Sequence, residues 1–202
     1  MKGRATSRQL RAAETKRRIY ESAVELMRVH GIDNFSVDDI VEAAGVSKGA
    51  FYVHYKSKYS LIADYVSTVD INYEDYFKSI PPDIKQSEML LLVTEKIADV
   101  LANDIGFDVM RTVYEALIKK TDGTEALLSY NRRLYQIYRQ IVTQGVRQGE
   151  FREALNIDSV SNHCIMSIRG MTFEWCVRYP DFDLKKEVLQ HFDILLAGIK
   201  NR

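Results

Sequence analysis

The sequence predicts an all-helical protein, and three observations support this prediction. The chain has 202 residues, of which 46% are apolar, so it can bury a sizeable core. Apolar residues recur at three- and four-residue intervals, and no strand-like alternation between hairpin turns accompanies them. The three prolines, Pro81, Pro82 and Pro180, fall between helical segments. We expect about nine helices, in an N-terminal domain of residues 1–60 and a C-terminal domain of residues 61–202.

The first domain begins with a long helix followed by a short one. Residues 14–30 carry apolar residues at helical spacing, and Gly31 ends that helix. Ser36 and Asp39 then form a capping box, in which each side chain accepts a hydrogen bond from a backbone N–H at the start of the second helix. Gly45 ends this helix, because glycine adopts the left-handed C-terminal conformation at little cost.

A third, shorter helix follows the turn at Gly45, with Ser47 as its expected N-cap. If Phe51 points into the core, a step of about 100° per residue places Tyr55 on the same inner face. Gly49 then points outward. We therefore expect a short outer face of small residues, which lets the backbone approach another surface closely.

The remaining helices form an antiparallel C-terminal domain. They are expected over residues 58–78, 84–103, 106–120, 124–148, 156–179 and 183–200. Asp83 with Gln86 suggests a capping box, Asp122-Gly123 a turn, and Asp183 the cap of the last helix. The helix over 58–78 is long enough to belong to both domains, so it is the expected lever between them.

Two capped helices joined by a glycine turn form a helix-turn-helix, which places its second helix in the major groove of DNA. On the outer face, Lys48 can reach guanine O6 or N7, and Val53 can touch a thymine methyl. Tyr52 and His54 can donate to phosphate oxygens, which fixes the register without reading sequence. A compact helical hairpin with no DNA-binding role would carry the same caps, so the outer face decides between the two readings.

Residues 36–61 resemble the DNA-binding segment of TetR-type bacterial transcriptional regulators. The matching positions are Ser36, Ile40, Ala44-Gly45-Val46-Ser47, Ala50, Phe51-Tyr52, His54-Tyr55, Ser57-Lys58 and Leu61. Tyr59 departs from the pattern, because the family often carries an acidic residue there. The resemblance implies that bases are read by Lys48, Gly49, Ala50 and Val53. It implies that phosphates are held by Ser36, Ser47, Tyr52, His54 and Lys58.

The resemblance also implies a homodimer that pairs through its last helices and binds a palindromic operator, most often as a repressor. Two recognition helices one DNA turn apart raise affinity and specificity. Apolar stripes on the last two helices supply the candidate interface: Ile168, Thr172, Trp175, Leu189, Phe192, Leu195, Leu196 and Ile199. The alternative is that these stripes are ordinary intramolecular core.

The family further implies an internal pocket for an unidentified small-molecule effector in the C-terminal domain. The candidate lining is rich in aromatic and methionine residues: Tyr73, Phe107, Met110, Tyr114, Tyr135, Tyr138, Met166, Arg169 and Phe173. Taken one at a time, such residues more often belong to the core. We predict no cofactor and no metal site.

The charge of the chain is zero overall but unevenly distributed. Residues 1–60 hold 11 basic and 7 acidic residues, whereas residues 61–202 hold 17 and 21. This polarity favours a DNA-facing N-terminal end. A basic N-terminal arm, with Arg4, Arg8 and Arg11, is expected to reach phosphates or the minor groove, although a merely solvated tail is the alternative.

Other features bound the function class. Cys164 and Cys176 are about 18 Å apart if they share one helix, so they cannot form a disulfide, which fits a reducing cytoplasm. The resemblance implies a bacterial cytoplasm and association with the nucleoid. No membrane-spanning run and no catalytic motif is evident, so an enzyme is not expected. A DNA-bound architectural protein of the same fold, without an inducer, remains the alternative to a repressor.

Overall fold

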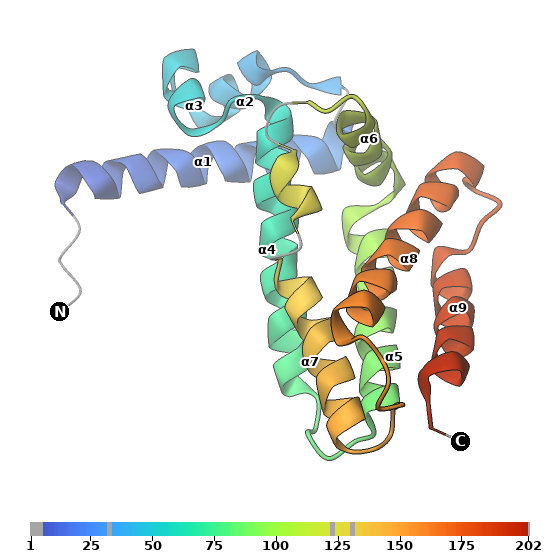
Figure 1. The fold of residues 1–202 in the computed structure, drawn as a ribbon. Coiled ribbons are helices and arrows are strands. Elements are labelled where there is room, and N and C mark those ends of the chain that lie inside the picture. The colour runs from blue at the N-terminus through green and yellow to red at the C-terminus, as the bar shows by residue number, and fades with distance from the viewer. Residues whose placement is uncertain (1–5, 32–33, 122–123, 130–131, 202) are drawn as a thin grey trace. The chain divides into compact units, whose positions relative to one another are not determined.

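The computed structural model describes residues 6–31, 34–121, 124–129 and 132–201, and it confirms the all-helical fold class (Figure 1). The chain divides into two compact units. The first comprises Met1–Tyr65 with Thr112–Ala126, and the second comprises Val66–Arg111 with Leu127–Arg202. The helix α4 (Lys58–Ser79) contributes residues to both units.

In the first unit, α1 (Ser7–His30) packs against α2 (Val37–Ala44) and α3 (Lys48–His54). The helix α1 begins at Ser7 rather than at the predicted residue 14, because Thr6 and Gln9 form a capping box. The core between these helices is apolar and consists of Ile19, Ala23, Met27, Phe35, Ile40, Ala44, Phe51, Tyr55 and Leu61.

The second unit is a helical bundle. Its helices are α5 (Gln86–Asp99), α7 (Arg133–Arg147), α8 (Ile157–Arg178) and α9 (Leu184–Ile199), with part of α4 and the start of α6 (Phe107–Ile118). The helix α5 packs against α7 and α9, and α8 packs against the same two helices. The predicted cap of α9 is observed, because Asp183 accepts a hydrogen bond from the Lys186 N–H at 3.0 Å. Asn156 caps α8 in the same way.

Two predicted helices are shorter than expected. The segment predicted as a helix over 84–103 leaves the α-helical geometry after Asp99 and continues as a π-helix over Val100–Ile105. The helix predicted over 124–148 is wrong in its first part, where a 3-10 helix over Glu125–Leu128 precedes α7. The predicted Asp122-Gly123 turn lies outside the described residues.

The capping box predicted for α5 is also wrong. Neither Asp83 nor any other nearby side chain caps the helix. Instead the carboxylate of Glu150, in the turn after α7, accepts hydrogen bonds from the backbone N–H groups of Gln86 at 2.6 Å and Ser87 at 3.1 Å, and from the Ser87 hydroxyl. The cap is therefore a tertiary contact between residues 64 positions apart.

Cys164 and Cys176 both lie on α8 and are free thiols, as their spacing predicts. Burial raises the pKa of Cys164 to about 12 and that of Cys176 to about 11, so neither is a thiolate at neutral pH. Within the described ranges, no helix is both long and apolar enough to cross a membrane.

Candidate nucleic-acid interface

The helix α2 begins and ends where the local sequence directs. The Ser36 hydroxyl accepts a hydrogen bond from the Asp39 N–H at 3.3 Å, and the Asp39 carboxylate accepts from the Ser36 N–H at 2.6 Å. The hydrogen bonds from Ser36 lower the pKa of Asp39, so the box is ionised at neutral pH. Gly45 has φ 60° and ψ 41°, the left-handed conformation that ends α2.

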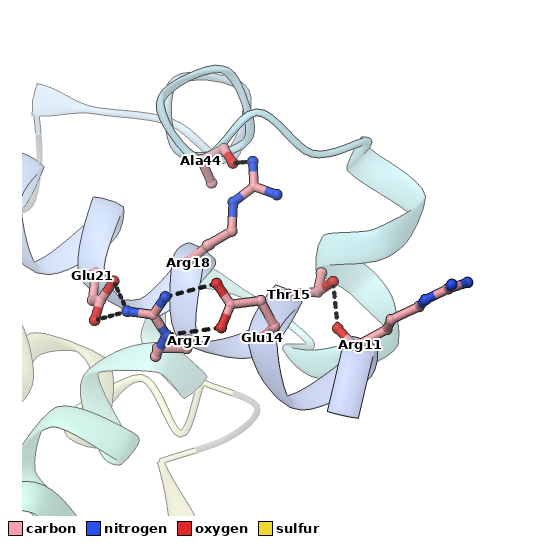
Figure 2. A network of polar contacts seen from close by, with 7 residues as sticks. All are labelled: Arg11, Glu14, Thr15, Arg17, Arg18, Glu21 and Ala44. Carbon is pink, nitrogen blue, oxygen red and sulfur yellow. Dashed lines mark hydrogen bonds and ion pairs between the residues drawn. The ribbon is translucent and has the colours of Figure 1, made fainter. Parts of the chain in front are cut away.

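A side chain of α1 completes the end of α2 (Figure 2). The guanidinium of Arg18 donates to the backbone carbonyl of Ala44 and, at 3.1 Å, to that of Gly45. A positive charge at these carbonyls also opposes the negative end of the helix dipole. Sequence reasoning missed this contact, because it joins residues 26 and 27 positions apart. It fixes the start of the turn that leads to α3.

The helix α3 buries one side and exposes the other. The Ser47 hydroxyl accepts a hydrogen bond from the Ala50 N–H at 3.1 Å, which caps the helix. Phe51 and Tyr55 are buried against α1 and α2, whereas Tyr52 is 53% and Val53 78% exposed. An apolar side chain as exposed as Val53 gains nothing from the fold of the isolated chain, so it is available for contact with a partner.

The other predicted DNA-contacting residues lie on or beside this face. Lys48 and Gly49 are exposed at the start of α3, and Ala50 and His54 are half-buried. Lys58, at the start of α4, donates to the Phe35 carbonyl at 3.0 Å and lies over the Phe35 ring. The structure thus brings the candidate residues to neighbouring positions in one unit. Some of their polar groups form hydrogen bonds within the protein, as Lys58 does with Phe35.

Lys48 has a partner that the sequence analysis did not identify. Its ammonium lies 2.7 Å from Oδ1 of Asp38 and donates to Oδ2 at 2.9 Å. Asp38 lies in the first turn of α2, and both side chains are more than half exposed. The hydrogen bond and the charge of Asp38 raise the pKa of Lys48. The start of α3 therefore presents an ion pair rather than a lone cation.

The helix α1 includes part of the predicted N-terminal arm. Arg8 and Arg11 lie on this helix, and in Figure 2 the Arg11 side chain extends away from the polar network around Arg17. Contact of Arg8 and Arg11 with phosphates or with the minor groove stays a prediction, and Arg4 lies outside the described residues.

The candidate effector residues separate into two groups. Tyr73, Met110, Tyr135 and Tyr138 are buried, and the Tyr138 hydroxyl pairs with that of Thr94 at 2.8 Å. Phe107 stacks on a neighbouring aromatic ring, Tyr114 and Arg169 are half-buried, and the Arg169 guanidinium donates to a backbone carbonyl.

Met166 and Phe173 do not fit an internal pocket. They are 52% and 41% exposed, because they lie on the outer side of α8. Periodicity alone did not distinguish this side of α8 from its buried side.

The candidate interface residues are mostly core of the chain itself. Ile168, Thr172 and Trp175 on α8 are buried, as are Phe192, Leu196 and Ile199 on α9, while Leu189 and Leu195 are half-buried. Six of the eight side chains therefore have little surface left to offer a second copy. The intramolecular alternative describes these six better, since α8 and α9 bury them against neighbouring helices of the same chain.

Comparisons with known proteins agree with this geometry. The family model described as bacterial regulatory proteins, tetR family, matches residues 19–65. The chain is 23% identical to a fatty acid metabolism regulator protein of Bacillus subtilis, over 91% of this chain and 95% of that protein. It is 24% identical to the HTH-type transcriptional regulator AcrR of Shigella flexneri, over 92% and 89%.

Among solved structures, the fold is similar to that of Thermus thermophilus FadR, a repressor in complex with lauroyl-CoA. The TM-score is 0.77 at 21% identity, covering 93% of this chain and 96% of that one. An exposed recognition helix on an all-helical chain with such relatives defines a DNA-binding transcriptional regulator, which is not an enzyme. Residues 19–65 match the TetR family of bacterial regulators, and the chain is similar to members of that family along most of its length.

Proposed function

We propose that this protein is a repressor that binds a palindromic operator as a homodimer and is released by a small-molecule effector. The observation that carries the proposal is the outer face of α3, where Lys48, Gly49 and Val53 are exposed on a helix whose other side is fixed in the core. Lysine and an apolar group on such a face suit guanine and thymine edges in the major groove. The expected location is the bacterial cytoplasm, on the nucleoid.

The DNA-binding part is tested on the operator duplex selected by the full-length protein from a random pool. Replacing both Lys48 and Tyr52 by alanine removes one base contact and one phosphate contact, so affinity should fall by about 10- to 100-fold. Fluorescence anisotropy at physiological salt measures the change. Arg28→Ala is the matched control, because Arg28 is also exposed but lies in the last turn of α1. Equal affinity of the double variant and the parent would refute the role of this face.

The homodimer is supported by apolar surface that the core does not use. Met166, Phe173 and Val177 follow one another at helical spacing on α8, and Val177 is 64% exposed. On α9, Ile194 is 66% exposed. A Cβ atom added at Gly170, between Met166 and Phe173, would have no neighbouring atom within 4 Å, so the surface of α8 is unobstructed there. Two such α8–α9 surfaces, related by a twofold axis, would bury each other's apolar groups.

Light scattering tests the dimer. The parent should have the mass of two chains at micromolar concentration, and introducing a charge by Val177→Asp together with Ile194→Asp should yield monomers. Leu10→Asp is the control, because Leu10 is an exposed apolar residue of α1 in the other unit. A parent that is monomeric at micromolar concentration contradicts the proposal.

The effector is proposed to be a molecule with a long apolar chain. The repressor from Thermus thermophilus holds lauroyl-CoA, and the interior of the second unit here combines apolar side chains with tyrosine hydroxyls. Because α4 belongs to both units, a ligand that favours one position of α4 would change the spacing between the two α3 helices of the proposed dimer. Lauroyl-CoA should weaken operator binding, and octanoyl-CoA serves as the chain-length control.

The architectural alternative makes the opposite prediction. Such a protein would occupy many dispersed sites in the genome, and acyl-CoA thioesters and apolar drugs would leave its DNA affinity unchanged. Genome-wide occupancy of a few promoters, combined with release by one ligand class, would support the repressor instead.

A further inference from the structure

The ion pair between α2 and α3 has a geometry that matches the edge of a base pair. Asp38 projects from the first turn of α2, and Lys48 from the first residue of α3. Their charged groups are 2.7 Å apart and exposed. In a G·C pair, guanine O6 accepts a Watson–Crick hydrogen bond from cytosine N4, so these two base atoms lie about 2.9 Å apart. Both also face the major groove, O6 as an acceptor and N4 as a donor.

We propose that Asp38 is a specificity-determining residue, which with Lys48 reads one G·C base pair in each half-site as a unit. Lys48 donates to guanine O6 and N7, and Asp38 accepts from the free N–H of cytosine N4. The match between the two spacings allows the pair to read the base edge without separating. This inference rests on the proposed function, because it requires that α3 enters the major groove.

The pair discriminates by orientation as well as by composition. In the inverted C·G pair, the donor of cytosine would face the ammonium and the acceptor of guanine would face the carboxylate, so like groups would meet. In a T·A pair, a thymine methyl occupies the side where guanine presents N7, so Lys48 would lose one acceptor. Asp38 also places a negative charge near the phosphates, which lowers affinity for any duplex that offers it no donor.

The test compares full-length protein with two variants that remove the same charge. Asp38→Asn removes the carboxylate of the pair, whereas Glu42→Gln removes an exposed carboxylate one turn further along α2. Affinities are measured by anisotropy on the duplex that the parent selects and on a series in which each base pair is inverted in turn. Asp38→Ser serves as a second substitution of Asp38, and thermal melting verifies that each protein is folded.

Inverting one G·C pair per half-site should weaken the parent by about 5- to 100-fold, as expected for one well-made base contact. Asp38→Ser should lose most of that discrimination, and Asp38→Asn, which keeps one acceptor oxygen without the charge, should lose part of it. Both should bind non-specific DNA more tightly, while Glu42→Gln keeps the discrimination of the parent. If the Asp38 variants keep it too, or if all three variants change affinity equally on every duplex, the inference is wrong. A parent that prefers no duplex would instead overturn the proposed function.

Discussion

Removing the remote cap of α5 should destabilise the second unit by an amount that follows from its hydrogen bonds. The Gln86 N–H donates to one carboxylate oxygen of Glu150 and the Ser87 N–H to the other. In Glu150→Gln one of these oxygens becomes an NH2 group, so one of the two N–H groups loses its acceptor. Both residues are buried, so an N–H left without an acceptor costs about 1–3 kcal/mol. Loss of the negative charge at the helix N-terminus adds about 0.3–1 kcal/mol.

A total of about 1.3–4 kcal/mol corresponds to a fall in Tm of roughly 3–16 °C for a protein of this size. Differential scanning calorimetry at pH 7 measures it. Glu153→Gln is the control, because Glu153 is exposed three residues further along the chain. Melting of both variants within 1 °C or so of the parent, well inside the expected shift, would refute the energetic role of this cap.

The pH dependence gives a second check on the same cap. Partial burial opposes ionisation of Glu150, but the hydrogen bonds from Ser87 and Gln86 outweigh it and hold the pKa below its ordinary value of 4.5. A carboxyl whose pKa is lower in the folded state stabilises the fold above pH 4.5 and loses that contribution as the pH falls through the folded value. The difference in unfolding free energy between parent and Glu150→Gln should therefore be constant from pH 7 to about 5.5 and shrink below pH 4.5.

Two further predictions concern packing and helix ends. A methyl group at Gly145 would lie 2.1 Å from the buried Phe151 ring, so Gly145→Ala should cost about 1–3 kcal/mol in thermal melts, whereas Gly49→Ala, which meets nothing closer than 3.8 Å, should not destabilise. Arg18→Ala removes the cap of α2 and should cost about 1 kcal/mol, more than Arg17→Ala, whose ion pairs are exposed to solvent and screened by salt. Urea unfolding compares the arginine variants, and a larger loss for Arg17→Ala would contradict this reasoning.

The parts of the fold that the sequence predicted correctly depend on neighbours within a few residues. The capping box of Ser36 and Asp39, the left-handed Gly45 and the cap at Ser47 each satisfy backbone groups within one helical turn. The capping box of Thr6 and Gln9 has the same local form, so the true start of α1 was readable and was overlooked.

The parts that it did not predict depend on contacts between distant segments. Glu150 caps a helix that begins 64 residues earlier, and the sequence near Gln86 does not indicate this contact. Likewise, the Leu127 carbonyl at the end of the 3-10 helix accepts hydrogen bonds from Arg132 and Arg169, and the second of these comes from α8. A helical apolar period over 124–148 carried no information about this interruption.

The same limit applies to the candidate surfaces. Periodicity identifies an apolar side of a helix but does not say which molecule covers it. Phe192 and Leu196 are covered by their own chain, while Val177 and Ile194 on the same two helices are left exposed. The outer face of α3 was easier to predict, because one fully buried residue, Phe51, fixes the orientation of a helix of only seven residues.

The 11 basic residues in residues 1–60 are not all free cations. Lys16 pairs with Asp64, Arg17 with Glu14 and Glu21, and Lys48 with Asp38. Such a cation must leave its carboxylate partner before it binds a phosphate, so it adds less DNA-binding free energy than a free lysine would. Sequence-independent affinity comes mainly from phosphate neutralisation, whereas base edges supply discrimination. For the operator binding proposed above, internal pairing should therefore lower non-specific affinity more than specific affinity.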